Sequence, residues 1–108
     1  VPVTAKTTVP VSSTDVNNVR VQTESVTLVS GSGLKAYSVV CGSFGLKANA
    51  EGLQKTLINA GYNAQIAYNE AKNMYRVVAS TFDEKVAAVQ SRDLLRENYP
   101  DAWLLYAK

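Results

Sequence analysis

Few residues of this chain could do chemistry, and most of them argue against catalysis. The 108 residues include no His, which removes the commonest general base and the commonest metal ligand. There is no Ser/His/Asp set, no Cys/His pair and no cluster with metal-ligand spacing. The single cysteine, Cys41, falls on the core side of a predicted strand, where we expect a buried, inert thiol rather than a nucleophile. The sequence therefore predicts a protein that is not an enzyme and uses no metal or cofactor.

Two polar residues remain as candidates for ligand binding. Arg76 could pair with a carboxylate through charge-assisted hydrogen bonds, and the hydroxyl of Ser43 could bond a hydroxyl or acetamido group. Each also has a plain structural interpretation, a surface ion pair for Arg76 and a helix-capping turn residue for Ser43. The carboxylates of the second half are interpreted as capping and solvating groups of a helix: Asp83, Glu84, Asp93, Glu97 and Asp101.

Hydrophobic patterning predicts the elements that hold these residues. Alternating apolar runs indicate strands, and apolar residues three and four apart indicate helices. The predicted order is β-α-β-β-α-β, an α+β fold of the ferredoxin-like (RNP-like) kind, with a four-stranded antiparallel sheet and both helices on one face. The predicted strands are 36–41, 62–68, 74–80 and 102–107, and the predicted helices are 47–60 and 81–98.

Turn and cap residues separate these elements. Gly42–Gly45 is predicted to turn the chain after the first strand, and Gly61 to cap the first helix. The polar stretch 69–73 has the length of a hairpin loop. Thr81 to Glu84 matches a capping box, which predicts Thr81 as the N-cap of the second helix.

Strand parity predicts which face of the sheet is free. Tyr37 and Tyr75 mark the face that the helices bury, and the opposite face is expected to be open. An open face with one cation among apolar and amide groups is typical of a ligand platform. The predicted residues of this face are Val40, Met74, Arg76 and Val78, with Asn63, Gln65 or Ala67 beside them. Trp103 and Tyr106 lie in a strand that is apolar on both sides, so either could belong to the core or to the platform.

The composition divides the chain into three parts. Residues 1–17, rich in Val, Thr, Ser and Pro, are predicted to be a disordered linker or tail. Residues 18–33 are predicted to be extended, either as more linker or as an extra N-terminal strand, and residues 34–108 form the domain. No run approaches the about 20 apolar residues that span a bilayer. Because the chain starts at Val1, a signal peptide or membrane anchor could lie upstream.

Nucleic acid is not an expected partner. The net charge of +2 is too small to indicate binding of duplex phosphates. RNA-recognition domains share the predicted strand order, but they stack bases on aromatic residues of the central strands. Here Val40, Met74 and Val78 occupy the corresponding exposed positions, and Tyr37 and Tyr75 have the wrong parity.

The two strand-to-helix junctions carry a family resemblance. The first is Val39-Val40-Cys41-Gly42-Ser43-Phe44 followed by a helix that contains Asn49-Ala50-Glu51 and ends in Ala60-Gly61-Tyr62. The second is Tyr75-Arg76-Val77, then a small-residue turn into Phe82 and a second helix. In this order and spacing they closely resemble the two halves of a SPOR domain (sporulation-related repeat) over about residues 35 to 107.

The resemblance implies a bacterial module of the periplasm or cell envelope that binds peptidoglycan without a cofactor. Such modules favour glycan strands stripped of stem peptides, at the division septum. Of the residues that the family uses at the glycan, Ser43 and Arg76 are retained. The family usually has Gln where Val40 stands, Gly-Pro where Ser80-Thr81 stands, and often an aromatic residue where Met74 stands.

These observations lead to one hypothesis and one alternative. The hypothesis is a monomeric, non-catalytic module that binds peptidoglycan glycan strands through the open sheet face, and that is membrane-attached only through an upstream anchor. Met74, Val40 and Val78 would pack under a pyranose face beside Ser43 and Arg76. The alternative is a ferredoxin-like domain that senses a small molecule or binds another protein.

Overall fold

The structure, a computed structural model, describes residues 19–107. Residues 1–17, for which a linker or tail is predicted, lie outside the described residues. The described part contains two helices and six strands. In chain order these elements are β1 (Val21–Glu24), β2 (Thr27–Ser30), β3 (Tyr37–Phe44), α1 (Lys47–Asn59), β4 (Gln65–Asn69), β5 (Met74–Phe82), α2 (Lys85–Leu95) and β6 (Trp103–Ala107).

All six strands form one sheet in the order β1-β6-β3-β5-β4-β2. The four middle strands, β6, β3, β5 and β4, pair antiparallel. The prediction of an α+β fold in the order β-α-β-β-α-β is thus confirmed from β3 onward, whereas the predicted number of strands is wrong. The extended segment before the domain supplies two strands, because β1 pairs parallel with β6 and β2 pairs antiparallel with β4.

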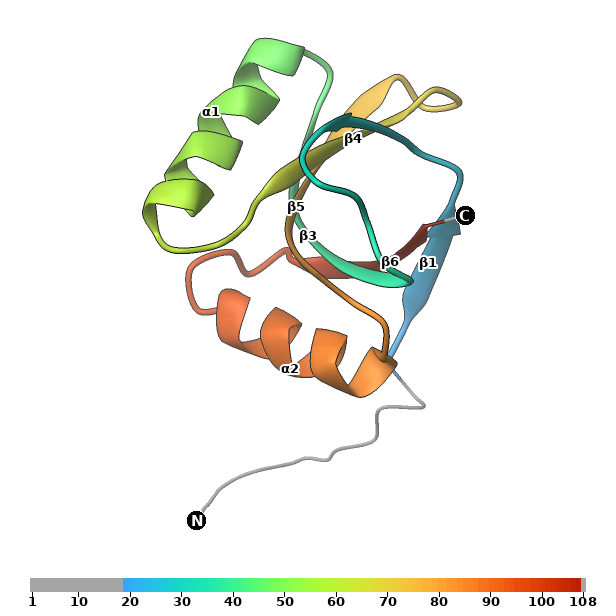
Figure 1. The fold of residues 1–108 in the computed structure, drawn as a ribbon, viewed down its shortest axis with the longest axis vertical. Helices are drawn as coiled ribbons and strands as arrows, with labels where there is room; N and C mark the ends of the chain where they lie inside the picture. Colours follow the sequence, from blue (N-terminus) through green and yellow to red (C-terminus); the bar gives the residue numbers. More distant parts are fainter. Residues whose placement is uncertain (1–18, 108) are drawn as a thin grey trace.

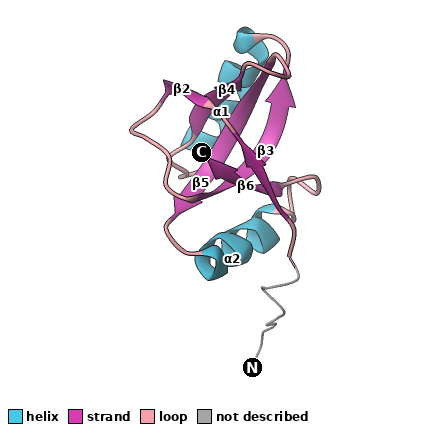
Figure 2. Ribbon diagram, turned by 90° about the vertical axis from the view of Figure 1, so that its right-hand side faces the viewer, coloured by secondary structure: helices cyan, strands magenta, loops and turns pink. Residues whose placement is uncertain are grey.

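Both helices pack on the same face of the sheet, as predicted (Figures 1 and 2). The main core lies between them and the strands, and its largest fully buried side chains include Leu57 of α1, Ile66 of β4 and Leu104 of β6. Gly61, with φ of 101°, ends α1 as predicted. The amide of Tyr62 then donates to the carbonyl of Leu57 at 3.0 Å, as in a Schellman cap.

The central pair of strands contains two bulges that change the strand parity. Cys41 is the extra residue between the pairs Val40↔Val78 and Gly42↔Val77, and Ala79 is the extra residue between Val78 and Ser80. A bulge inserts one unpaired residue, so the simple alternation of faces fails beyond it. Ser43 therefore pairs with Arg76 on the face away from the helices, although strict alternation from Cys41 would put it among the core residues.

Two predicted boundaries are wrong for the same reason. The predicted turn at Gly42–Gly45 is mostly strand, because β3 continues to Phe44. The predicted N-cap, Thr81, lies inside β5, and its hydroxyl accepts a hydrogen bond from the amide of Lys35 at 2.7 Å. The residue before α2 is instead Glu84, whose side chain makes no capping hydrogen bond. Small polar residues that resemble caps in the sequence are thus used here to extend the long central strands.

The face that was predicted to be open is covered. β1 and β2 lie at opposite edges of the sheet and only Ser25 and Val26 separate them, so the chain must cross from edge to edge. Val26 and Leu34 pack on a second, smaller core of Val40, Val78 and Leu105. Figure 1 shows this part of the chain, in blue-green and teal, on the side opposite to both helices. We call residues 24–34 the crossing segment.

Candidate functional site

The crossing segment places a carboxylate directly on Arg76. Arg76 Nε donates to Glu24 Oε1 at 3.1 Å, and Nη2 donates to Glu24 Oε2 at 2.8 Å. The third nitrogen, Nη1, donates to Ser43 Oγ at 2.7 Å. Both charged residues are buried: Arg76 is 7% exposed and Glu24 is 6% exposed. The structure thus brings the two sequence-predicted residues, Ser43 and Arg76, together, and adds an acidic partner that the sequence did not predict.

Glu24 receives further contacts on its outer side. Gln22 Nε2 donates to Oε2 at 2.8 Å, and Lys72 Nζ lies 3.5 Å from the same oxygen. Burial acts to raise the pKa of Glu24, but hydrogen bonds from Arg76 and Asn69 and the charge of Arg76 outweigh it, so the pKa lies below its usual range. The carboxyl is therefore ionised at neutral pH, and the cation of Arg76 is neutralised within the fold.

Trp103 belongs to the same face, which settles the orientation that parity could not decide. The Cζ atom of Arg76 lies 5.2 Å from the centroid of the Trp103 ring, in a cation–π contact. Tyr106 lies elsewhere, edge-on to Tyr37 with 5.4 Å between ring centroids. Arg76 is thus held by a carboxylate, a hydroxyl and an aromatic ring, which together fix the plane of its guanidinium.

The apolar residues predicted for the site differ in their access to a ligand. Val40 and Val78 lie on the predicted face, but both are fully buried under the crossing segment. Met74, at the start of β5, is half-buried. A ligand on this surface would reach Met74, Ser43 and the edge of Trp103 directly, and the two valines only if the crossing segment moved.

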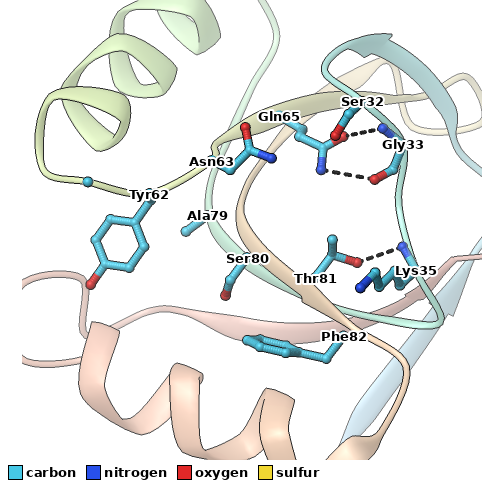
Figure 3. Close-up of a pocket in the computed structure, with 11 residues that line it drawn as sticks. Ser32, Gly33, Lys35, Tyr62, Asn63, Gln65, Ala79, Ser80, Thr81 and Phe82 are labelled. Carbon is cyan, nitrogen blue, oxygen red and sulfur yellow. Dashed lines mark hydrogen bonds between the residues drawn. The ribbon is translucent and has the colours of Figure 1, made fainter.

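The neighbouring amide residues also hold the crossing segment. Gln65 Nε2 donates to the carbonyl of Gly33 at 3.0 Å, and Gln65 Oε1 accepts from the amide of Gly33 at 2.8 Å (Figure 3). Ala67, which pairs with Arg76 across the β4–β5 ladder, is fully buried. Both residues lie on the face predicted for them, but the segment above them makes that face an interior.

A separate cavity of about 470 Å³ lies where β4 diverges from β5 (Figure 3). Its walls combine Tyr62 and Phe82 with the polar side chains of Asn63 and Ser80 and with Lys35. The pairing of β4 with β5 ends at Val78, so the last residues of β5 border this cavity without a β4 partner. Asn63 and Gln65, predicted to lie beside the open-face site, line this cavity, whereas Ser43, Arg76, Met74, Val40 and Val78 do not.

Glu24 and Trp103 are the residues of this site that sequence reasoning missed or left unplaced. Glu24 stands between two runs of β-branched residues, where a carboxylate is unusual in a strand, and this was the one available signal. Its partner is 52 residues away, and nothing local indicates that β1 would join the edge strand β6.

Within residues 19–107, no group of three or more Cys, Asp or Glu side chains is arranged to hold a metal ion. Over the same described residues, neither helix has both the length and the apolar character needed to traverse a bilayer. The arrangement at Arg76 supports recognition of an anionic or polar ligand, since a planar guanidinium matches a carboxylate with two parallel hydrogen bonds.

Comparison with known proteins identifies a family for this fold. Neither the curated proteins nor the solved structures gave a match. A family profile described as SPOR domain matches residues 33–106, which include α1, α2 and strands β3 to β6. SPOR is a peptidoglycan-binding family whose members occur in proteins of the cell envelope. Because this match covers more than half of the chain, the chain belongs to the SPOR domain family.

Proposed function

We propose that this chain binds the glycan strands of peptidoglycan, with a preference for strands that lack stem peptides, and that this preference directs it to the division septum. Binding would be non-covalent and non-catalytic. The family membership supports peptidoglycan as the ligand. The observation that carries the finer proposal is the bidentate hold of Arg76 on a carboxylate within its own fold.

The chemistry of a stripped glycan strand suits the groups around Arg76. Removal of the stem peptide leaves a lactyl carboxylate on the sugar, and a guanidinium recognises a carboxylate better than it recognises an amide. Ser43 would bond an adjacent hydroxyl or acetamido group. The ring of Trp103 and the side chain of Met74 offer apolar surface to a pyranose ring, next to the charged group.

Retention on purified sacculi tests the proposal. Sacculi treated with an amidase, which removes the stem peptides, should retain the chain, and untreated sacculi should retain less of it. The alternative, a domain that senses a small molecule or binds another protein, is favoured if neither preparation retains it.

The test of Arg76 needs a variant that removes both charges of the Glu24–Arg76 ion pair. Arg76→Ala alone would leave Glu24 buried and unpaired, which typically costs about 3–5 kcal/mol and could unfold the chain. The double variant Glu24→Ala/Arg76→Ala removes both charges, and circular dichroism would establish that it folds. A folded double variant should lose retention on amidase-treated sacculi. Retention equal to that of the wild type would exclude Arg76 from the site.

A further inference from the structure

The surface that is proposed to bind the glycan is already covered by the crossing segment of the chain itself. The crossing segment lies over Val40 and Val78, and its first residue, Glu24, takes two of the three guanidinium nitrogens of Arg76. A ligand carboxylate that approached Arg76 would need the same donors. The two contacts cannot exist together.

The pocket that receives Glu24 is a built anion site rather than an incidental surface pair. Five observations support this: two charge-assisted bonds from Arg76, the bond from Gln22, the proximity of Lys72, the ring of Trp103 behind the guanidinium and the burial of both charged groups. Every one of these groups would serve a free carboxylate equally well. Glu24 is therefore a chemical stand-in for the ligand that the face is proposed to bind.

The attachment of the crossing segment is local and limited. β1 and β2 have four residues each, and the β2–β4 ladder is irregular between Leu28 and Ser30. Leu28 is 41% exposed, and Ser25 and Thr27 are exposed too. Its apolar contacts come from three residues: Val26 and Leu34 pack on the small core, and Val29 packs against the main core. Short edge strands with few buried contacts open at lower free energy than the main core.

We propose that the crossing segment is an autoinhibitory occupant of the glycan-binding face, which must move aside before Arg76 and the two valines can take a ligand. This inference rests on the proposed function. In the closed state Glu24 satisfies Arg76, and in the bound state the ligand's carboxylate replaces it. The apparent affinity is then reduced by the fraction of molecules in which the segment is open.

Removal of the negative charge of Glu24 should strengthen glycan binding. Glu24→Gln keeps the shape of the side chain but removes its charge, and Glu51→Gln makes the same change at an exposed position on α1. Calorimetric titration with soluble glycan strands from amidase-treated sacculi should give Glu24→Gln a Kd about tenfold lower than that of the wild type. Glu51→Gln should match the wild type. Circular dichroism would establish that Glu24→Gln folds although Arg76 loses its buried counter-charge, and equal or weaker binding by the folded variant would overturn the proposal.

A reversible disulfide that ties the crossing segment to β4 allows a second test, because glycan binding can be measured with the disulfide formed and again after its reduction. Thr27 and Tyr68 are paired across the β2–β4 ladder, at a spacing that suits a disulfide between cysteines. The natural thiol should not compete, because burial raises the pKa of Cys41 to about 11. The oxidised Thr27→Cys/Tyr68→Cys variant should bind at least about tenfold more weakly than the same protein after reduction. The single variants Thr27→Cys and Tyr68→Cys are the controls.

The outcomes separate this inference from the proposed function. If the wild type binds glycan while Glu24→Gln and the oxidised disulfide variant bind equally well, the autoinhibition is wrong and the glycan site stands. If Glu24→Gln and the reduced variant bind but the oxidised one does not, both proposals are supported, even where the wild type binds too weakly to measure. If no form binds, both are overturned.

Discussion

Ser43 and Arg76 face each other across the β3–β5 ladder, 33 residues apart in the chain, with Arg76 Nη1 and Ser43 Oγ 2.7 Å apart. This bond leaves the guanidinium's other two nitrogens directed at Glu24. The hydroxyl thereby orients the cation for a carboxylate, whether the carboxylate belongs to the chain or to a ligand.

Replacement of Ser43 should weaken glycan binding as well as the fold. Ser43→Ala removes a hydrogen bond to a charged group, a contact worth about 1.5–3 kcal/mol, and frees the guanidinium to rotate. We expect a loss of glycan affinity of about tenfold by calorimetry and, because the Ser43–Arg76 bond lies within the fold, a lower melting temperature as well. Ser80→Ala is the matched control, because Ser80 bonds Ser91 of α2 on the helix side. A similar loss in both variants would contradict a specific role for Ser43.

The contact between Arg76 and Trp103 should contribute to ligand binding. Trp103→Leu keeps an apolar side chain over the small core but removes the cation–π contact, which is worth about 1 kcal/mol. We expect a drop in affinity of about fivefold, measured by retention on amidase-treated sacculi across a protein concentration series. Tyr106→Leu, on a ring that contacts Tyr37 instead, should leave retention unchanged.

Acid should release the crossing segment. The pKa of Glu24 in the folded chain lies below its value of 4.5 in the unfolded chain, so its stabilising contribution is complete above about pH 4.5 and is lost as the pH falls through the lower, folded value. The groups that face this carboxyl are the cations of Arg76 and Lys72 and the neutral side chains of Gln22 and Asn69. The proposed sensor is therefore the carboxyl of Glu24.

Fluorescence of Trp103, the only tryptophan in the chain, reports this release. Emission should shift on acidification in the wild type, since the ring loses the cover of the neighbouring segment. The Glu24→Gln variant should lack this transition. Identical titration curves for the two proteins would show that Glu24 does not hold the segment.

A glycine substitution should open the segment without touching any charge. A Cβ atom on Gly31 would lie 2.5 Å from Cγ of Gln65, so the alanine variant must push the segment off β4. Gly33→Ala is the control, because Gly33 has a similarly positive φ of 127° but open space around it, which isolates backbone strain of about 1–3 kcal/mol. Hydrogen exchange over residues 24–34 should be faster in Gly31→Ala than in Gly33→Ala. Equal exchange rates would mean that Gln65 yields instead.

Local periodicity was enough to predict the order of the elements from β3 to β6 and the faces of most of their core residues, but not where β3 and β5 end or where α2 begins. The alternation of Val39, Val40 and Cys41 and the helical spacing of Ala50 and Leu57 depend on neighbours a few residues away, which a sequence displays directly. The position of Ser43 opposite Arg76 could not be derived in that way. It depends on the bulge at Cys41, a local irregularity that no composition rule indicates.

Periodicity could not predict that the crossing segment covers the sheet face opposite the helices. The alternating residues before Gly31 indicate a strand, but not which strand edge it joins. That choice was made by long-range contacts, chiefly Glu24 with Arg76 and Val26 with the small core. Parity correctly placed Arg76 away from the helices, and only the three-dimensional structure shows that this side of the sheet is an interior.

The two short strands β1 and β2 also hinder strand pairing between the sheets of different copies of the chain. They occupy the outer edges of β6 and β4, where long strands would otherwise present unpaired amides and carbonyls to other molecules. A fragment that begins at residue 33, where the family match starts, would lack both β1 and β2. The edges of β6 and β4 would then be free to pair with strands of other copies. A fragment meant to remain monodisperse should therefore keep both β1 and β2, and displacement of these two strands would expose the same edges of β6 and β4.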